Sequence, residues 1–337
     1  MNKIEKEENS KANGNKKLQL AFYWAASCGG CEIAVLDIDE KILDVVAIAD
    51  IVFWPVAIDT KYKDVEAMED KSIDVCFFNG SIRTSEQLHL AKLLRKKSTI
   101  LVAFGACAVN GGIPGLANLS SKDEIFRVSY LENPSTVNPE KILPKTSVQV
   151  EEGILTLPEF YDVVKSLDQV VDVDYYLPGC PPHPNMIMTA IGAIAENNLP
   201  PKGSIIGPLK SVCDECKFEK SEKMITEIKR IYEVEQVEDK CLLEQGIICL
   251  GPATRGGCEA QCLDANMPCT GCGGPTPNSI DQGASMISAI ASILGLEGEE
   301  EMSEEEVDKL IEQIVDPVGT FYKYGLPTAL LNRSMKK

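Results

Sequence analysis

Residues 18–31 read Leu18-Gln-Leu-Ala-Phe-Tyr-Trp-Ala-Ala-Ser-Cys-Gly-Gly-Cys31, an apolar run followed at once by a C-x-x-C pair. The run 18–24 is short, apolar and aromatic, which is typical of a strand buried inside a parallel sheet. We therefore predict a strand over these residues, with the cysteine pair in the turn at its carboxyl end.

Similar runs recur through the first 200 residues. They predict further strands at 51–57, 73–79, 99–104 and 171–177. Helical patterns lie between or after them, at 33–46, 85–97 and 185–198. Repeated strand-then-helix units with short links predict an α/β fold with a doubly wound parallel sheet.

The character of the chain changes near Pro200, where Pro, Gly and Cys replace the periodic apolar residues. We expect an α/β domain over 18–200 and an irregular, cysteine-rich domain over 201–337 that buries little core. Near its end, Ser303 and Glu306 form a capping box that predicts a helix. Residues 1–17 alternate Lys and Glu with polar residues, and we interpret them as a disordered tail.

The charge and hydropathy of the chain exclude some classes of function. The formal net charge is −18, which argues against nucleic acid and anionic membrane surfaces as partners. No apolar run reaches the roughly 18 residues that a membrane-spanning helix needs. The amino-terminal residues lack the apolar core of a signal peptide, so we expect a cytoplasmic protein.

Thirteen cysteines are unusual for a cytoplasmic chain, and there are only two histidines. A reducing compartment disfavours disulfides, so this many thiols indicate metal binding or redox chemistry. Soft thiolate ligands favour zinc or iron–sulfur clusters.

Four cysteines come directly after predicted strands, and we call them the proximal set: Cys28, Cys31, Cys107 and Cys180. The carboxyl ends of parallel strands meet at one sheet edge, where open α/β sheets bind ligands. Four converging thiolates suit one [4Fe–4S] cluster. A thioredoxin-like pair would explain only Cys28 and Cys31, and a structural zinc site is the other alternative. Cys76 lies inside a predicted strand and is interpreted as a small buried hydrophobe.

Eight more cysteines lie beyond residue 200: Cys213, Cys216, Cys241, Cys249, Cys258, Cys262, Cys269 and Cys272. A C-x-x-C pair stands at each end of this series and supplies two ligands from one turn. Two four-iron clusters or two structural zinc sites would each use all eight. Either kind of metal would supply folding free energy that a core-poor segment lacks.

At this point the motifs resemble those of a known family, the small subunits of nickel–iron hydrogenases. The resemblance is carried by 27–33 (SCGGCEI), 105–112 (GACAVNGG), 178–182 (PGCPP) and 267–275 (MPCTGCGGP), in the family's order. It extends from about Leu18 to near Leu331. The chain is most similar to the cytoplasmic, methyl-viologen-reducing type of methanogens, which does not reduce coenzyme F420.

The resemblance implies a flavodoxin-like first domain whose proximal [4Fe–4S] cluster is held by the proximal set. By the order of the motifs it implies a distal cluster on Cys213, Cys216, Cys241 and Cys249, the distal set. It also implies a medial cluster on the medial set, Cys258, Cys262, Cys269 and Cys272. Membrane-linked members carry histidine where Cys213 stands and often proline where Cys262 stands. With cysteine at both positions, we expect three [4Fe–4S] clusters in this chain.

The function implied by the resemblance is electron transfer without bond-making in this chain. Hydrogen would be split in a [NiFe] large subunit. Electrons would leave for a small iron–sulfur subunit or a flavin-containing complex of the heterodisulfide reductase type. Within the family, an F420-reducing or ferredoxin-linked hydrogenase is the alternative. Outside the family there are two alternatives. A quinone reductase subunit of the complex I type shares the first cluster arrangement but has adjacent cysteines. A zinc-stabilised interaction module would have no redox role.

Overall fold

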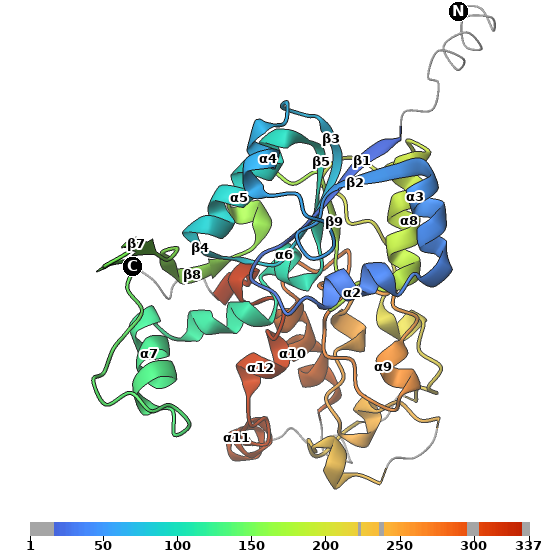
Figure 1. The fold of residues 1–337 in the computed structure, drawn as a ribbon. Helices are drawn as coiled ribbons and strands as arrows, with labels where there is room; N and C mark the ends of the chain where they lie inside the picture. Colours follow the sequence, from blue (N-terminus) through green and yellow to red (C-terminus); the bar gives the residue numbers. More distant parts are fainter. Residues whose placement is uncertain (1–16, 222–223, 236–238, 295–302, 332–337) are drawn as a thin grey trace, which may run out of the picture.

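The computed structural model describes residues 17–221, 224–235, 239–294 and 303–331, so nearly all of the predicted amino-terminal tail lies outside the described residues. Its main feature is a five-stranded parallel sheet in the order β2-β1-β3-β5-β9 (Figure 1). The strands are β1 Leu18–Trp24, β2 Ala49–Phe53, β3 Ile73–Asn79, β5 Ser98–Phe104 and β9 Tyr175–Leu177. This strand order is the flavodoxin-like one, which confirms the predicted fold class.

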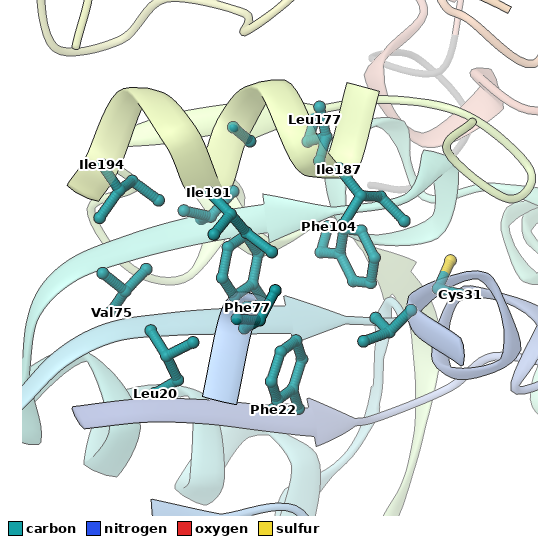
Figure 2. Packing of buried hydrophobic residues seen from close by; sticks show 14 of the residues in the cluster. Leu20, Phe22, Cys31, Val75, Phe77, Phe104, Leu177, Ile187, Ile191 and Ile194 are labelled. Carbon is teal, nitrogen blue, oxygen red and sulfur yellow. The ribbon is translucent and has the colours of Figure 1, made fainter. Parts of the chain in front are cut away.

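Helices cover both faces of the sheet. Alternate residues of each strand point to opposite faces, so each face carries apolar side chains that the helices bury. Leu20 and Phe22 of β1 share one core with Ile187 and Ile191 of α8 (Figure 2), whereas Tyr23 belongs to the core on the other face. Residues of α2 Gly30–Leu36, α3 Ile42–Ile48 and α8 Pro184–Ala195 join the first core. Residues of α4 Tyr62–Ala67, α5 Ser85–Lys97 and α6 Ala106–Asn110 join the second.

Some elements differ from the sequence prediction. The strand predicted at 51–57 is β2, which ends at Phe53, and the helical pattern at 33–46 is two helices separated by a 3-10 turn. An insertion after β5 holds α7 Lys122–Arg127 and an antiparallel hairpin of β6 Ser147–Val150 and β7 Gly153–Thr156. After it, β8 Phe160–Lys165 pairs antiparallel with the short β4 Ile82–Thr84.

The part of the chain beyond residue 200 contains helices and turns, and among its described residues only isolated bridges replace strands. Its helices are α9 Gln261–Asp264, α10 Gln282–Ile293, α11 Glu304–Glu312 and α12 Pro317–Phe321. The capping box predicted for α11 is present, since the Ser303 hydroxyl accepts from the Glu306 amide at 3.4 Å.

Short 3-10 turns and one π turn complete the described chain. They are η1 Asp39–Lys41, η2 Ile113–Leu119, η3 Val128–Glu132, η4 Leu167–Gln169, η5 Val212–Asp214, η6 Ile231–Glu233, η7 Leu243–Gln245, η8 Gly251–Ala253 and η9 Leu326–Thr328. Here η3 is the π turn.

The expectation of little core beyond residue 200 is wrong. Met286 and Ile290 of α10 are buried together with Phe321 and Leu263 in a third apolar cluster. The carboxyl-terminal part of the chain also contacts the first part, because the Gly112 amide donates to the carbonyl of Tyr324 at 2.9 Å. The two parts therefore pack against each other beneath the carboxyl edge of the sheet (Figure 1).

Candidate functional site

The proximal set lies at the carboxyl edge of the sheet. Cys28 and Cys31 follow β1, Cys107 is in α6 directly after β5, and Cys180 comes shortly after β9. The Ala106 amide donates to the Gly179 carbonyl at 2.7 Å and ties the last two segments together. Figure 2 shows Cys31 at the end of the buried core, with its sulfur pointing away from the packed side chains. The topology thus brings together four thiols that are up to 152 residues apart in the sequence (180 − 28).

The four proximal thiols interact electrostatically. Burial is the main cause that raises the pKa of Cys31, followed by the charges of Cys107, Cys180 and Cys28. Burial and neighbouring thiols also raise the pKa of Cys107 to about 11 and that of Cys180 to about 11. Such thiols stay protonated at neutral pH unless a cation is bound, because a coordinated metal removes the proton.

Two glycines allow the backbone to pass close to these sulfurs. A Cβ on Gly105 would lie 2.3 Å from the Cys31 sulfur, and one on Gly112 would lie 2.4 Å from the Cys107 sulfur. Both glycines have positive φ, +85° for Gly105 and +59° for Gly112, a conformation that L side chains rarely adopt. The proximal set is therefore surrounded by backbone that only glycine fits.

The distal set also forms one group. Burial raises the pKa of Cys213 to about 12; the charge of Lys220 opposes this shift, and Cys249, Cys241 and Cys216 add to it. Gly251 lies between two of its members, since a Cβ there would be 3.1 Å from the Cys213 sulfur and 3.6 Å from the Cys249 sulfur.

The medial set lines a cavity of about 40 Å³. All four of its cysteines contribute to the wall, as do Pro178, Gly179 and Pro181 from the proximal segment. Burial raises the pKa of Cys272 to about 12, and the charges of Cys258 and Cys262 add to that effect. The structure thus brings together at one cavity four thiols from two separate C-x-x-C and C-x-x-x-C segments.

The three sets are neighbours in the order proximal, medial, distal. The backbone of Cys180 lowers the pKa of the Cys272 thiol and its charge raises it, which places the proximal set beside the medial set. The Cys269 amide donates to the Cys249 sulfur at 3.3 Å, which links the medial set to the distal set. Amide donors of this kind stabilise negative charge on a sulfur and tune the potential of a metal bound to it.

The thirteen cysteines are all free thiols. Among the described residues, no three His, Cys, Asp or Glu side chains are close enough to hold a single metal ion. A lone zinc ion needs its sulfurs about 2.3 Å from the metal.

The remaining cysteine and the two histidines have simpler surroundings. Cys76 is fully buried in β3, as predicted. His89 is exposed on α5, 3.2 Å from a carboxylate oxygen of Glu66. His183 caps α8, where its Nδ1 accepts from the Asn185 amide at 3.3 Å, and it also lines the medial cavity.

Glu32, next to Cys31, is expected from the sequence to make local hydrogen bonds, and the structure identifies its partners. Its side chain is buried and accepts from the indole of Trp54 and from the Asn79 amide at 3.1 Å. Burial raises the pKa of Glu32, and these two hydrogen bonds oppose that rise. Trp54 and Asn79 come from β-strand ends and could be recognised only once those strands are paired.

No helix among the described residues is both long enough and apolar enough to cross a membrane. A family model described as "NADH ubiquinone oxidoreductase, 20 Kd subunit" matches residues 28–194. The match covers the whole proximal set but ends before the other two sets. In fold comparison, a chain of the [NiFeSe]-hydrogenase of Desulfomicrobium baculatum has a TM-score of 0.49 and 18% identity, covering 78% of this chain and 96% of that chain.

Full-length relatives match across all three sets. The iron–sulfur subunit of the F420-non-reducing hydrogenase of Archaeoglobus profundus is 44% identical over 326 residues, 95% of this chain and 99% of the relative. A subunit of the F420-non-reducing hydrogenase of Methanothermobacter marburgensis is 39% identical over 325 residues, 96% of this chain and 98% of the relative. These relatives set aside the complex I and F420-reducing alternatives. The chain belongs to the family of F420-non-reducing hydrogenase iron–sulfur subunits, which are small subunits of [NiFe] hydrogenases.

Proposed function

We propose that this chain carries electrons from hydrogen oxidation in a [NiFe] large subunit, through three [4Fe–4S] clusters, to an acceptor of the heterodisulfide reductase type. The observation that carries the proposal is the unbroken series of thiol sets. The proximal and medial sets are neighbours, since Cys180 acts on the pKa of Cys272, and the medial and distal sets are joined by the hydrogen bond from Cys269 to Cys249. A one-electron carrier at each set would give a continuous path through the chain.

The proximal cluster is assigned to Cys28, Cys31, Cys107 and Cys180. The donor set fits, since four thiols converge at the sheet edge and act on one another electrostatically. Gly105 and Gly112 fit as well, because side chains at these positions would collide with the ligand sulfurs. These residues would hold the cluster and exclude water from its buried side.

The medial cluster is assigned to the four cysteines of the cavity, Cys258, Cys262, Cys269 and Cys272. The distal cluster is assigned to Cys213, Cys216, Cys241 and Cys249, which share Gly251 and their mutual electrostatic interaction. Because cysteine stands at every position, a full four-iron cluster at each set is the natural occupant.

Each bound cluster supplies reversible one-electron transfer without rearranging the protein. Ligation by thiolate alone, without histidine, favours low reduction potentials. The chain's own amides oppose that trend locally, as the Cys269 amide does at the Cys249 sulfur. Low potentials suit a low-potential acceptor such as an iron–sulfur or flavin subunit better than a quinone.

The two partners are assigned to different faces. At the proximal set, Cys28 is exposed, and large exposed apolar side chains surround its segment: Trp24, Ile33 and Ile113. Exposed apolar side chains grouped around a redox site are typical of a protein interface. We assign this face to the large subunit, and the surface near the distal set to the acceptor subunit.

A cytoplasmic setting is part of this proposal. Its support is that all thirteen cysteines are free thiols, which suits a reducing compartment. An oxidising compartment would put twelve grouped thiols at risk of disulfide formation before any metal is inserted.

The test is anaerobic analysis of iron, sulfide and zinc in the purified complex, with the co-purifying chains identified. Three four-iron clusters predict about twelve iron and about twelve sulfide per copy of this chain, after subtraction of any partner's content. A nickel-containing large subunit should co-purify. Zinc in place of iron, with no nickel-containing partner, would reject the proposal and leave a zinc-stabilised interaction module.

A further inference from the structure

Arg255 is a buried cation in the wall of the medial cavity. Its side chain and backbone are only 7% exposed, and it lines the cavity together with the four medial cysteines. Nη1 donates to the carbonyl of Pro208 at 3.0 Å, and the backbone amide donates to the carbonyl of Gly274 at 3.0 Å. The buried Nε has no hydrogen-bond partner among the described residues.

No carboxylate of the described residues is paired with this guanidinium. Burial lowers the pKa of Arg255, and no neighbouring charge in the described part of the chain opposes the effect. The buried Arg83 is different, because its guanidinium lies 4.3 Å from the ring of Phe160 and interacts with the charge of Asp162. A buried charge without a counter-charge is strongly unfavourable, so the site of Arg255 calls for an anion.

We infer that Arg255 is the fixed counter-charge of the medial cluster and raises that cluster's reduction potential. The inference rests on the proposed function. A four-iron cluster with four thiolate ligands is anionic, and one-electron reduction adds a further negative charge. A nearby positive charge in a low-dielectric cavity therefore stabilises the reduced form more than the oxidised form. The electron comes from hydrogen oxidation, and no other reactant is needed.

A carboxylate near the medial set, that of Glu215, has the opposite sign of charge. Glu215 is buried, and its Oε1 accepts from the Gly257 amide at 2.7 Å. Its charge raises the pKa of Cys258, after the larger effect of burial. Glu215 is also 3.3 Å from Lys210, so its charge is partly balanced, whereas that of Arg255 is not. Arg255 is therefore the unbalanced charge at the medial set.

The test is a redox titration of the intact complex, followed by electron paramagnetic resonance, in Arg255→Gln, Arg255→Lys and Arg83→Gln. Gln removes the charge of Arg255, and Lys keeps it. Arg83→Gln is the matched control, because it removes a buried guanidinium from the β4–β8 sheet. We expect Arg255→Gln to shift the reduction equilibrium of one cluster at least tenfold toward the oxidised form. This shift is a fall of about 59 mV for a one-electron couple. Arg255→Lys should restore most of the potential, and Arg83→Gln should change none.

Three results would overturn the inference. The first is an Arg255→Gln complex with full iron content and three unchanged potentials. The second is an equal shift of all three potentials, which would indicate a general change in folding. The third is that neither the Arg255→Gln complex nor the Arg255→Lys complex assembles. If only the Arg255→Lys complex assembles, the result supports the need for a positive charge at this position. A wild-type complex without iron would instead reject the proposed function, so the two failures are distinguishable.

Discussion

The backbone amide of Cys269 donates a hydrogen bond of 3.3 Å to the sulfur of Cys249, across 20 residues of sequence. One cysteine belongs to the medial set and lines its cavity, and the other belongs to the distal set. Their charges also interact, since Cys249 adds to the burial that raises the pKa of Cys269. A ligand residue of one proposed cluster thus supports a ligand of the next. The two proposed clusters would therefore lie close together, which favours electron transfer between them.

Gly105→Ala should remove the proximal cluster. The new Cβ would lie 2.3 Å from the Cys31 sulfur, at a φ of +85°. We expect a loss of about four iron per chain, measured by iron and sulfide analysis of the complex. The matched control is Gly203→Ala, whose φ is +86° but whose Cβ would meet no atom within 4 Å. Equal iron loss in both variants would show that backbone strain, and not the closeness of the sulfur, is responsible.

Cys76→Ala should leave the iron content unchanged. Cys76 is fully buried on β3, in the core that α5 covers, and takes no part in the three sets. Removal of its sulfur leaves a small cavity, with an expected cost of roughly 1 kcal/mol in unfolding free energy. Cys107→Ala provides the comparison, with an expected loss of about four iron. Iron loss from Cys76→Ala would mean that the sets have been assigned wrongly.

Asp174→Asn should destabilise the first part of the chain. Burial alone would raise the pKa of Asp174, but hydrogen bonds from Arg95 and Lys202, each at 2.6 Å, and from the Leu101 amide outweigh it and lower the pKa. Loss of the charge should cost roughly 2 kcal/mol, measured as a lower midpoint in denaturant.

The pH dependence of this effect follows from the sign of the shift. A carboxyl whose folded pKa is lowered stabilises the fold fully above its unfolded pKa of about 3.9 and loses that contribution only as the pH falls through the lower folded value. The difference between wild type and Asp174→Asn should therefore be constant from about pH 6 to 8. Glu66→Gln, at an exposed site beside His89, is the control and should change stability little. A difference that vanishes within this range would contradict the pairing of Asp174.

The sequence predicted some elements to the residue and others poorly. For β1, β3 and α5 the predicted and observed bounds coincide, because local pattern and burial agree there. The strand predicted to extend to residue 57 ends at Phe53. The prediction was too long because the apolar run continues into Trp54, which lies after the strand and is buried by its contact with Glu32. A run of apolar residues cannot distinguish burial within a strand from burial in the turn that follows it.

The candidate site also has parts that the sequence predicted and parts that it did not. Sequence motifs placed the proximal set at the sheet edge, because cysteines directly after parallel strands must converge there. The burial of Arg255 and the carboxylate network of Glu32 could not be predicted, since both depend on segments far away in the sequence. Likewise, the core around Met286 joins α10 to Leu263 and Phe321 from other segments, so its burial depends on contacts between those segments.

The most direct test of electron conduction separates hydrogen splitting from electron delivery in the intact complex. Cys249→Ser removes a distal ligand, while proton–deuterium exchange with hydrogen gas reports on the large subunit alone. We predict that exchange persists, that hydrogen still bleaches the visible absorbance of the remaining clusters, and that reduction of the acceptor falls at least tenfold. Acceptor reduction at the wild-type rate, in a variant shown to lack about four iron, would contradict the account, because electrons would then leave the complex without crossing this chain.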